Sequence, residues 1–182
     1  GPVQFNWGFS LNKVRIVDSS GITSHFSSES RFERGTMGKD YRVYYSLIAF
    51  HGIVSAKRAA KTFLKEEDLK LLDEAMVKAI PLLATTRSKI GQQPRLYLRV
   101  EYINDTTFLG DLRSYIRLVE DSGSLRDISE VQLDIQPLCQ YLAQHKDEIK
   151  QVHVWQDSQL RLVPSASLGE ALQNSGIKLV SV

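Results

Sequence analysis

Apolar positions divide the first part of the chain into two strand-like segments. Residues 3–17 are rich in aromatic and β-branched side chains and end at a turn signal, which predicts one bent strand or two short ones. Residues 42–54 form a long apolar run, which is typical of a central strand covered on both faces. We therefore expect the second segment to anchor a sheet.

The segment between these strands follows no regular period. Residues 22–26 are compatible with a strand, but residues 27–39 offer no face that a strand or helix would bury. A protruding hairpin or a mobile loop is therefore expected here.

A helix is predicted over residues 64–83. Apolar side chains recur there at three- and four-residue spacing, and acids fill positions 66–68, where the helix dipole favours them. Pro81 is expected to end or kink this helix. Residues 95–102 then alternate between polar and apolar side chains, which predicts a strand. We expect its apolar face to pack on the helix and its polar face to meet solvent or a ligand.

The last third of the chain alternates between helix and strand. Pro137 at a first helical position predicts a helix to about Ile149, and a capping-box pattern beginning at Ser167 predicts a later short helix. Short strands are expected at 152–155 and 177–182. This order indicates an α/β (α+β) fold of the ferredoxin-like or RNA-recognition-motif kind.

Composition adds three limits. With 182 residues, 42% hydrophobic and 24% charged, the chain fits a single domain over residues 1–182. No apolar stretch approaches the roughly 18 residues that a membrane span needs, so no membrane partner is expected. The single cysteine, Cys139, cannot form an internal disulfide, which favours the reducing cytoplasm.

The net charge of +2 says little by itself, but the charges are segregated along the sequence. Acids gather on the predicted helix and in the later loops, away from the cations. Segregation could produce one basic face for a polyanion, or the charges could be scattered over a solvated surface. The cations form three clusters: Lys13 and Arg15; Lys57, Arg58, Lys61 and Lys65; and Arg87, Lys89, Arg95 and Arg99.

Motifs for metal binding and catalysis are absent from the sequence. Its four histidines stand far apart and follow no metal-ligand spacing, and no nucleotide-binding glycine loop or nucleophile elbow is present. We therefore expect no metal and no cofactor. Catalytic groups brought together only by folding would leave no such trace, yet nothing here requires an enzyme.

Two loops have the composition of elements that contact a nucleic-acid backbone. Residues 85–92 combine hydroxyls, Arg87, Lys89 and a glycine, which suits phosphate contact; the alternative is a plain polar loop. Residues 35–39 place Met37 on a glycine-flanked tip, from which an apolar side chain can wedge between bases while neighbouring cations hold phosphate. The alternative there is a disordered surface loop.

The same segments resemble a known family. Four blocks, in order along the chain, are similar to the successive signature blocks of the Cas-seven backbone subunits of CRISPR type I-B and I-C systems, within the RAMP superfamily. The blocks are residues 1–14, 35–39, 45–52 and 86–96.

This resemblance implies a fold and a function. Family members resemble a right hand with a modified RNA-recognition-motif palm, fingers and a thumb hairpin. Several copies form a filament along one crRNA, together with other Cascade subunits, and present the RNA to target DNA without cutting it. By analogy residues 18–42 form the thumb-like insertion, Met37 is its wedge, and Arg87 and Lys89 lie on the palm.

The family begins with a strand and an Asn-Pro-Asn-Gly-Asp-type loop, neither of which is present here. The resemblance therefore implies the C-terminal portion of such a subunit, without the first strand and the finger region. The candidate RNA-binding residues are Lys13, Arg31, Arg34, Met37, Lys39, Arg42, Arg87, Ser88, Lys89 and Gln92.

Two other functions stay open. A metal-independent endoribonuclease of the same superfamily would use a histidine, such as His51 or His25, with a tyrosine as general acid and base. A ferredoxin-like domain that binds a protein or a small ligand is the other alternative.

Overall fold

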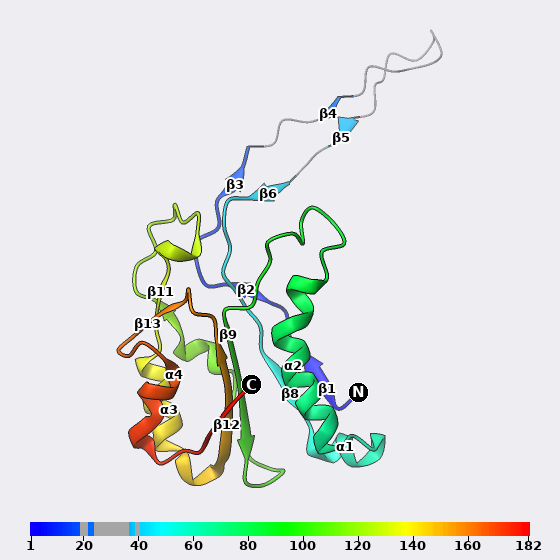
Figure 1. Ribbon diagram of the computed structural model, residues 1–182, viewed down its shortest axis with the longest axis vertical. Coiled ribbons are helices and arrows are strands. Elements are labelled where there is room, and N and C mark those ends of the chain that lie inside the picture. The colour runs from blue at the N-terminus through cyan, green and yellow to red at the C-terminus, as the bar shows by residue number, and fades with distance from the viewer. Residues whose placement is uncertain (19–21, 24–36, 39–40) are drawn as a thin grey trace.

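The structure is a computed structural model that describes residues 1–18, 22–23, 37–38 and 41–182. Helices and small sheets alternate along it, so the predicted mixed α/β class is confirmed (Figure 1). The elements form a body and a long two-stranded ribbon that leaves it at one end.

The ribbon consists of short strands that pair in nested order. β1 pairs with β8, β2 with β7, β3 with β6 and β4 with β5, all antiparallel. The outgoing strands are β1 (Val3–Phe5), β2 (Phe9–Ser10), β3 (Ile16–Val17) and β4 (Ile22–Thr23). The returning strands are β5 (Met37–Gly38), β6 (Arg42–Val43), β7 (Ile48–Ala49) and β8 (Gly52–Val54).

The pairing shifts by one residue between each pair of strands and the next. From the pair Phe5 with Gly52 to the pair Phe9 with Ala49, for example, the outgoing arm advances one residue more than the returning arm. An extra residue on one arm bends a ribbon and increases its twist, as a β-bulge does. The four short ladders are therefore parts of one irregular hairpin.

The prediction of a central strand over residues 42–54 is wrong. Strands β6, β7 and β8 each have a single neighbour, and the side chains of Val43, Ile48 and Ile53 are 48%, 50% and 40% exposed. A long apolar run does not distinguish a strand covered on both faces from a ribbon arm that touches the body only in part. Residues 3–17 likewise form three short strands rather than one or two.

Two three-stranded sheets form the frame of the body. In the first, β12 (Ile149–Gln156) lies between β9 (Leu96–Tyr102), to which it is antiparallel, and β14 (Leu179–Ser181), to which it is parallel. In the second, β11 (Gln132–Asp134) lies between β10 (Arg117–Leu118) and β13 (Arg161–Val163).

The hydrophobic core lies on one face of the first sheet. Helices α3 (Gln136–Gln144) and α4 (Leu168–Leu172) cover this face, and their leucines are fully buried together with Val152. Burying one such side chain stabilises a fold by roughly 1.5–3 kcal/mol. The apolar face of β9 packs against this cluster. The expectation that it packs on the helix of residues 64–83 is therefore wrong.

That helix itself is confirmed as α2 (Glu66–Leu82), with three acids in its first turn and Pro81 next to its last residue. It follows α1 (Ala56–Thr62), which begins at the N-cap Ser55. α2 lies along the other, polar side of β9 (Figure 1). The sequence did not indicate this arrangement. The apolar stripe of α2 suggested packing on the apolar face of β9, but that face packs on the hydrophobic core.

The predicted C-terminal elements are confirmed with changed bounds. The first helix ends at Gln144 and a 3₁₀ turn, Lys146–Glu148, follows it. The N-cap hydroxyl of Ser167 accepts a hydrogen bond from the Glu170 amide at 3.1 Å, as the capping pattern predicts. None of the helices in the described part of the chain is long and apolar enough to cross a membrane. The palm and the thumb-like insertion over 18–42 stay predictions.

Candidate nucleic-acid interface

The loop between α2 and β9 presents cations and hydroxyls at the surface. Arg87, Ser88 and Gln92 are exposed, and Lys89 is half-buried. The loop extends from the end of α2 toward the end of the molecule from which the ribbon leaves (Figure 1).

Hydrogen bonds within this loop fix its shape. The Lys89 amide donates to the Thr86 carbonyl at 3.0 Å, and the Gln92 side-chain amide donates to the Ser88 carbonyl at 2.9 Å. The hydroxyls of Thr86 and Ser88 are 3.0 Å apart. Gly91 has a φ of +86°, which only glycine adopts without strain. Ser88 and Gln92 therefore shape the loop that carries Arg87 and Lys89.

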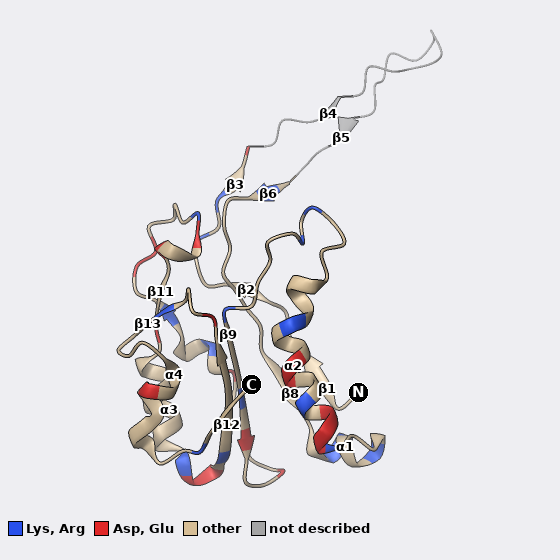
Figure 2. Cartoon of the chain, in the orientation of Figure 1, with Lys and Arg blue, Asp and Glu red and all other residues tan. Residues whose placement is uncertain are grey.

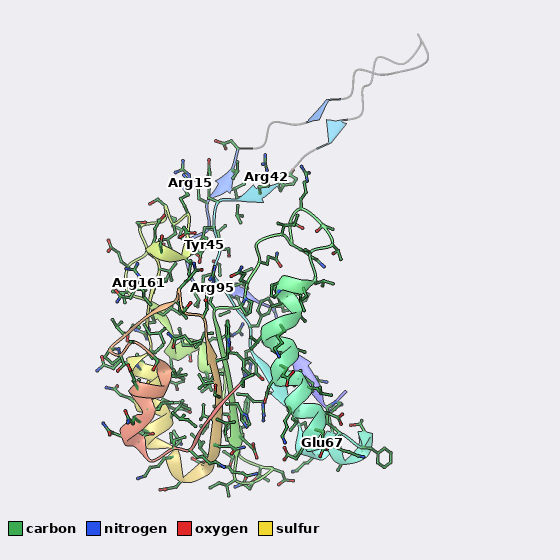
Figure 3. The ribbon with its side chains drawn as sticks, viewed as in Figure 1. Arg15, Arg42, Tyr45, Glu67, Arg95 and Arg161 are labelled. Atoms are coloured by element: carbon green, nitrogen blue, oxygen red, sulfur yellow. The ribbon has the colours of Figure 1, made fainter. Side chains whose placement is uncertain are left out.

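A second group of cations lies at the base of the ribbon. Arg15 directly precedes β3, and Arg42 in β6 pairs with Val17 across the ladder, so both come from neighbouring arms (Figure 3). Lys13 is exposed, and its backbone amide donates to Asp121 Oδ2 at 2.6 Å. This contact ties the outgoing arm to a loop of the body.

Arg126 and Tyr44 also belong to this base, and the sequence gave no sign of them. The guanidinium carbon of Arg126 lies 3.5 Å from the centroid of the Tyr44 ring, and that of Arg15 lies 5.5 Å from it. Arg126 lies in a stretch without regular period, and its partner is far away in sequence. No local pattern reveals such a pair.

The described candidate residues thus occur at one end of the molecule. Figure 2 shows cations both on the loop after α2 and near β3 and β6, toward the same end of the long axis. Met37 is described only as part of the β5 backbone, paired with Thr23. Arg31, Arg34 and Lys39 lie outside the described residues.

Two arginines of the third basic cluster are internal. Arg99 donates from Nε and Nη2 to the two carboxylate oxygens of Asp73, at 2.6 Å each, and its side chain is 14% exposed. Arg95 forms an ion pair with Asp157 and donates to Gln159 Oε1 at 2.8 Å. Both are therefore engaged with acids of the chain and unavailable to a polyanion.

The sequence left one basic face and scattered charges as alternatives, and the described cations do not form a single face. The cluster of Lys57, Arg58 and Lys61 lies on α1, at the end away from the ribbon (Figure 2). Acids lie near each group, in the first turn of α2 next to α1 and at Asp121 beside the Lys13 amide. The surface cations therefore form separate groups. The group toward the ribbon end includes the loop of residues 85–92, which the sequence predicted as a phosphate-contacting element.

The described histidines make contacts within the chain. His51 is half-buried, and its ring centroid lies 6.3 Å from that of Phe108. His153 is 8% exposed, between Asp73 and Glu101. His25 is outside the described residues.

The described part of the chain is a small α/β body with a projecting ribbon and separate groups of exposed cations, one of them toward the ribbon end. The family model described as CRISPR-associated protein Cas7 matches residues 1–136 of the sequence. The chain therefore belongs to this family. This is the Cas-seven family indicated by the ordered sequence blocks, so that prediction is confirmed.

A curated relative from Haloferax volcanii, also described as CRISPR-associated protein Cas7, is 36% identical over 165 residues. The alignment covers 89% of this chain and 48% of the relative. The chain therefore spans about half the length of this relative. The I-B/I-C branch and the assignment to a C-terminal portion stay predictions.

Proposed function

We propose that this chain binds crRNA as part of a backbone subunit of a type I Cascade complex in CRISPR-Cas antiviral defence. The observation that carries the proposal is the position of the loop between α2 and β9, which contains Arg87 and Lys89, at the same end of the molecule as the ribbon base (Figure 1). Membership of the Cas7 family supports it.

The geometry suits a ligand recognised through its phosphates. Cations that neutralise phosphates release condensed counterions, and this release supplies affinity without regard to base sequence. The loop of Arg87 and Lys89 is already held by its own hydrogen bonds, so little ordering is needed when RNA binds. The base of the ribbon contributes a second group of cations toward the same end of the molecule.

The finer parts of the proposal follow from the family resemblance. The ribbon corresponds to the thumb, with Met37 toward its tip, and the body to an RNA-recognition-motif-like palm. In the complete subunit, copies would form a filament along the crRNA with other Cascade subunits and leave bases free for target DNA. The complete subunit would act in the cytoplasm.

The proposal is tested by fluorescence anisotropy with a labelled single-stranded RNA of mixed sequence. The double variant Arg87→Ala/Lys89→Ala is expected to weaken binding about tenfold, because two phosphate contacts are lost. The matched control is Lys57→Ala/Lys61→Ala, which removes the same charge from α1 at the other end. It should change affinity only slightly. Equal losses in both variants would indicate diffuse charge attraction and contradict an interface at the ribbon end.

We further propose that the chain binds RNA without cutting it. Labelled repeat RNA incubated with the protein in a metal chelator should stay intact. Cleavage that is abolished by His51→Ala would instead establish the endoribonuclease alternative.

A further inference from the structure

Helix α2 is attached to the sheet through a charged residue. Within α2, which the structure describes in full, the buried residue is Asp73, at 4% exposure. Among the described residues, none of those in the hydrophobic core or packed against it comes from α2. Apolar residues of α2 such as Leu72 and Met76 are only half-buried, so the polar bonds to Asp73 form the most deeply buried contact of the helix.

Asp73 is surrounded by donors from the polar face of the sheet. Arg99 makes two hydrogen bonds to it at 2.6 Å, and the Tyr97 hydroxyl donates to Oδ1 at 2.7 Å. His153 Nδ1, from the neighbouring strand β12, lies 3.4 Å from Oδ2. A two-pronged pair of this kind fixes orientation as well as distance, because both partners are planar.

Asp73 remains an anion in this environment. Burial alone would raise the pKa of Asp73, but the hydrogen bonds from Arg99 and Tyr97 outweigh burial and lower it. Burial raises the pKa of the Tyr97 hydroxyl, and the hydrogen bond to Asp73 raises it further. The network is therefore fully formed at neutral pH.

Beyond the half-buried Met76 and Val77, the end of the helix is exposed. Residues 78–88, which include the last turn of α2 and the start of the loop, are all exposed. On its other side the loop leads into β9 through Arg95, which directly precedes the strand and is held by Asp157 and Gln159. Arg87 and Lys89 thus stand on a segment that is held on one side by Arg99 of β9 and on the other by Arg95, just before that strand.

We infer that Asp73 is a positioning residue for RNA binding: through Arg99 it fixes α2 and thereby holds Arg87 and Lys89 at the ribbon end. This inference rests on the proposed function. Asp73 touches no RNA itself, because it is buried between the helix and the sheet.

The direction of the change in RNA affinity distinguishes a loss of positioning from a simple change in net charge. Removing a carboxylate makes the protein more positive, so long-range attraction alone would strengthen its binding to a polyanion. Loss of positioning would weaken binding instead. The matched control is Glu74→Gln, which neutralises an exposed acid of the same helix whose ion pair with Lys78 is 3.4 Å long.

The experiment combines RNA anisotropy with amide hydrogen exchange on the full 182-residue chain. Asp73→Asn should weaken RNA binding about fivefold, and Glu74→Gln should leave it unchanged or slightly stronger. In Asp73→Asn, exchange should increase over residues 66–94 while β12 stays protected, which shows that the body remains folded. Tyr97→Phe removes one hydrogen bond without changing the charge, and it should give a smaller change of the same kind.

Three results would overturn the inference. These are unchanged or stronger RNA binding by Asp73→Asn, unchanged exchange over 66–94, and an affinity loss that simply adds to that of Arg87→Ala/Lys89→Ala. If Asp73 acts through the loop, the triple variant should bind no worse than the double variant. If the unaltered protein binds no RNA, the proposed function fails, and so does the RNA role of Asp73; the exchange data then show only whether Asp73 anchors the loop.

Discussion

The guanidinium of Arg126 lies over the ring of Tyr44, with its central carbon 3.5 Å from the ring centroid. Tyr44 belongs to the returning arm of the ribbon, and Arg126 belongs to a loop of the body. The backbone amide of Tyr44 also donates to the Arg15 carbonyl at 3.1 Å. At the base of the ribbon, the two arms are therefore bonded to each other, and the returning arm also contacts the body.

Arg126→Ala should lower the free energy of unfolding by about 0.5–1 kcal/mol, the size of an exposed cation–π contact. In a background of Tyr44→Leu, the same change should cost almost nothing, because the ring is gone. Urea unfolding of the four proteins of this double-mutant cycle measures the coupling. Fully additive losses would show that the two side chains do not interact.

Asn12→Ala should be more costly, because Asn12 is 5% exposed and joins both arms of the ribbon. Its Oδ1 accepts a hydrogen bond from the Leu47 amide at 2.8 Å, and its Nδ2 donates to the Tyr45 carbonyl at 3.3 Å. Leaving these groups unpaired costs about 1–3 kcal/mol.

The measurement is again urea unfolding. The control is Asn6→Ala, because Asn6 is exposed and its side chain accepts a hydrogen bond from the amide of the adjacent Trp7, within the same arm. Equal stability losses at the two positions would contradict the role of Asn12.

Glu101→Gln should reduce stability at neutral pH but have a vanishing effect in acid. Burial tends to raise the pKa of Glu101, but hydrogen bonds from Lys150, Gln151 and His153 lower it to about 2, from an ordinary value of 4.5. Because the folded-state pKa is lowered, the stabilisation is complete above about pH 4.5 and is lost as the pH falls toward 2.

At pH 7 we expect Glu101→Gln to cost about 1–2 kcal/mol, and the difference from the unaltered protein should shrink steadily below pH 4.5. Urea unfolding at a series of pH values tests this. The exposed acid Glu120, changed to Gln, serves as the control. A pH-independent difference for Glu101→Gln would mean that its carboxylate is not the stabilising group.

Periodic elements were predictable from the sequence, and so was the family. α2 and β9 show their periods locally, and the bounds of the structure differ from the predicted ones by a residue or two. The family was indicated by the order of four blocks along the chain, which does not depend on knowing the fold.

The ribbon and the polar contact of α2 were not predictable in the same way. Residues 42–54 are apolar enough for a central strand, and only their pairing with the outgoing arm shows that they form a ribbon. Arg99 stands on the polar face of a strand, as a ligand-binding cation would. Its partner Asp73 lies on α2, which a local pattern cannot place on that face.

The salt dependence of RNA binding tests the central proposal most directly. The logarithm of the association constant should fall linearly with the logarithm of salt concentration. The slope for Arg87→Ala/Lys89→Ala should be shallower by about 1.4, since each phosphate contact on a single strand contributes about 0.7. A flat dependence, or the same slope in both proteins, would contradict RNA binding through this loop.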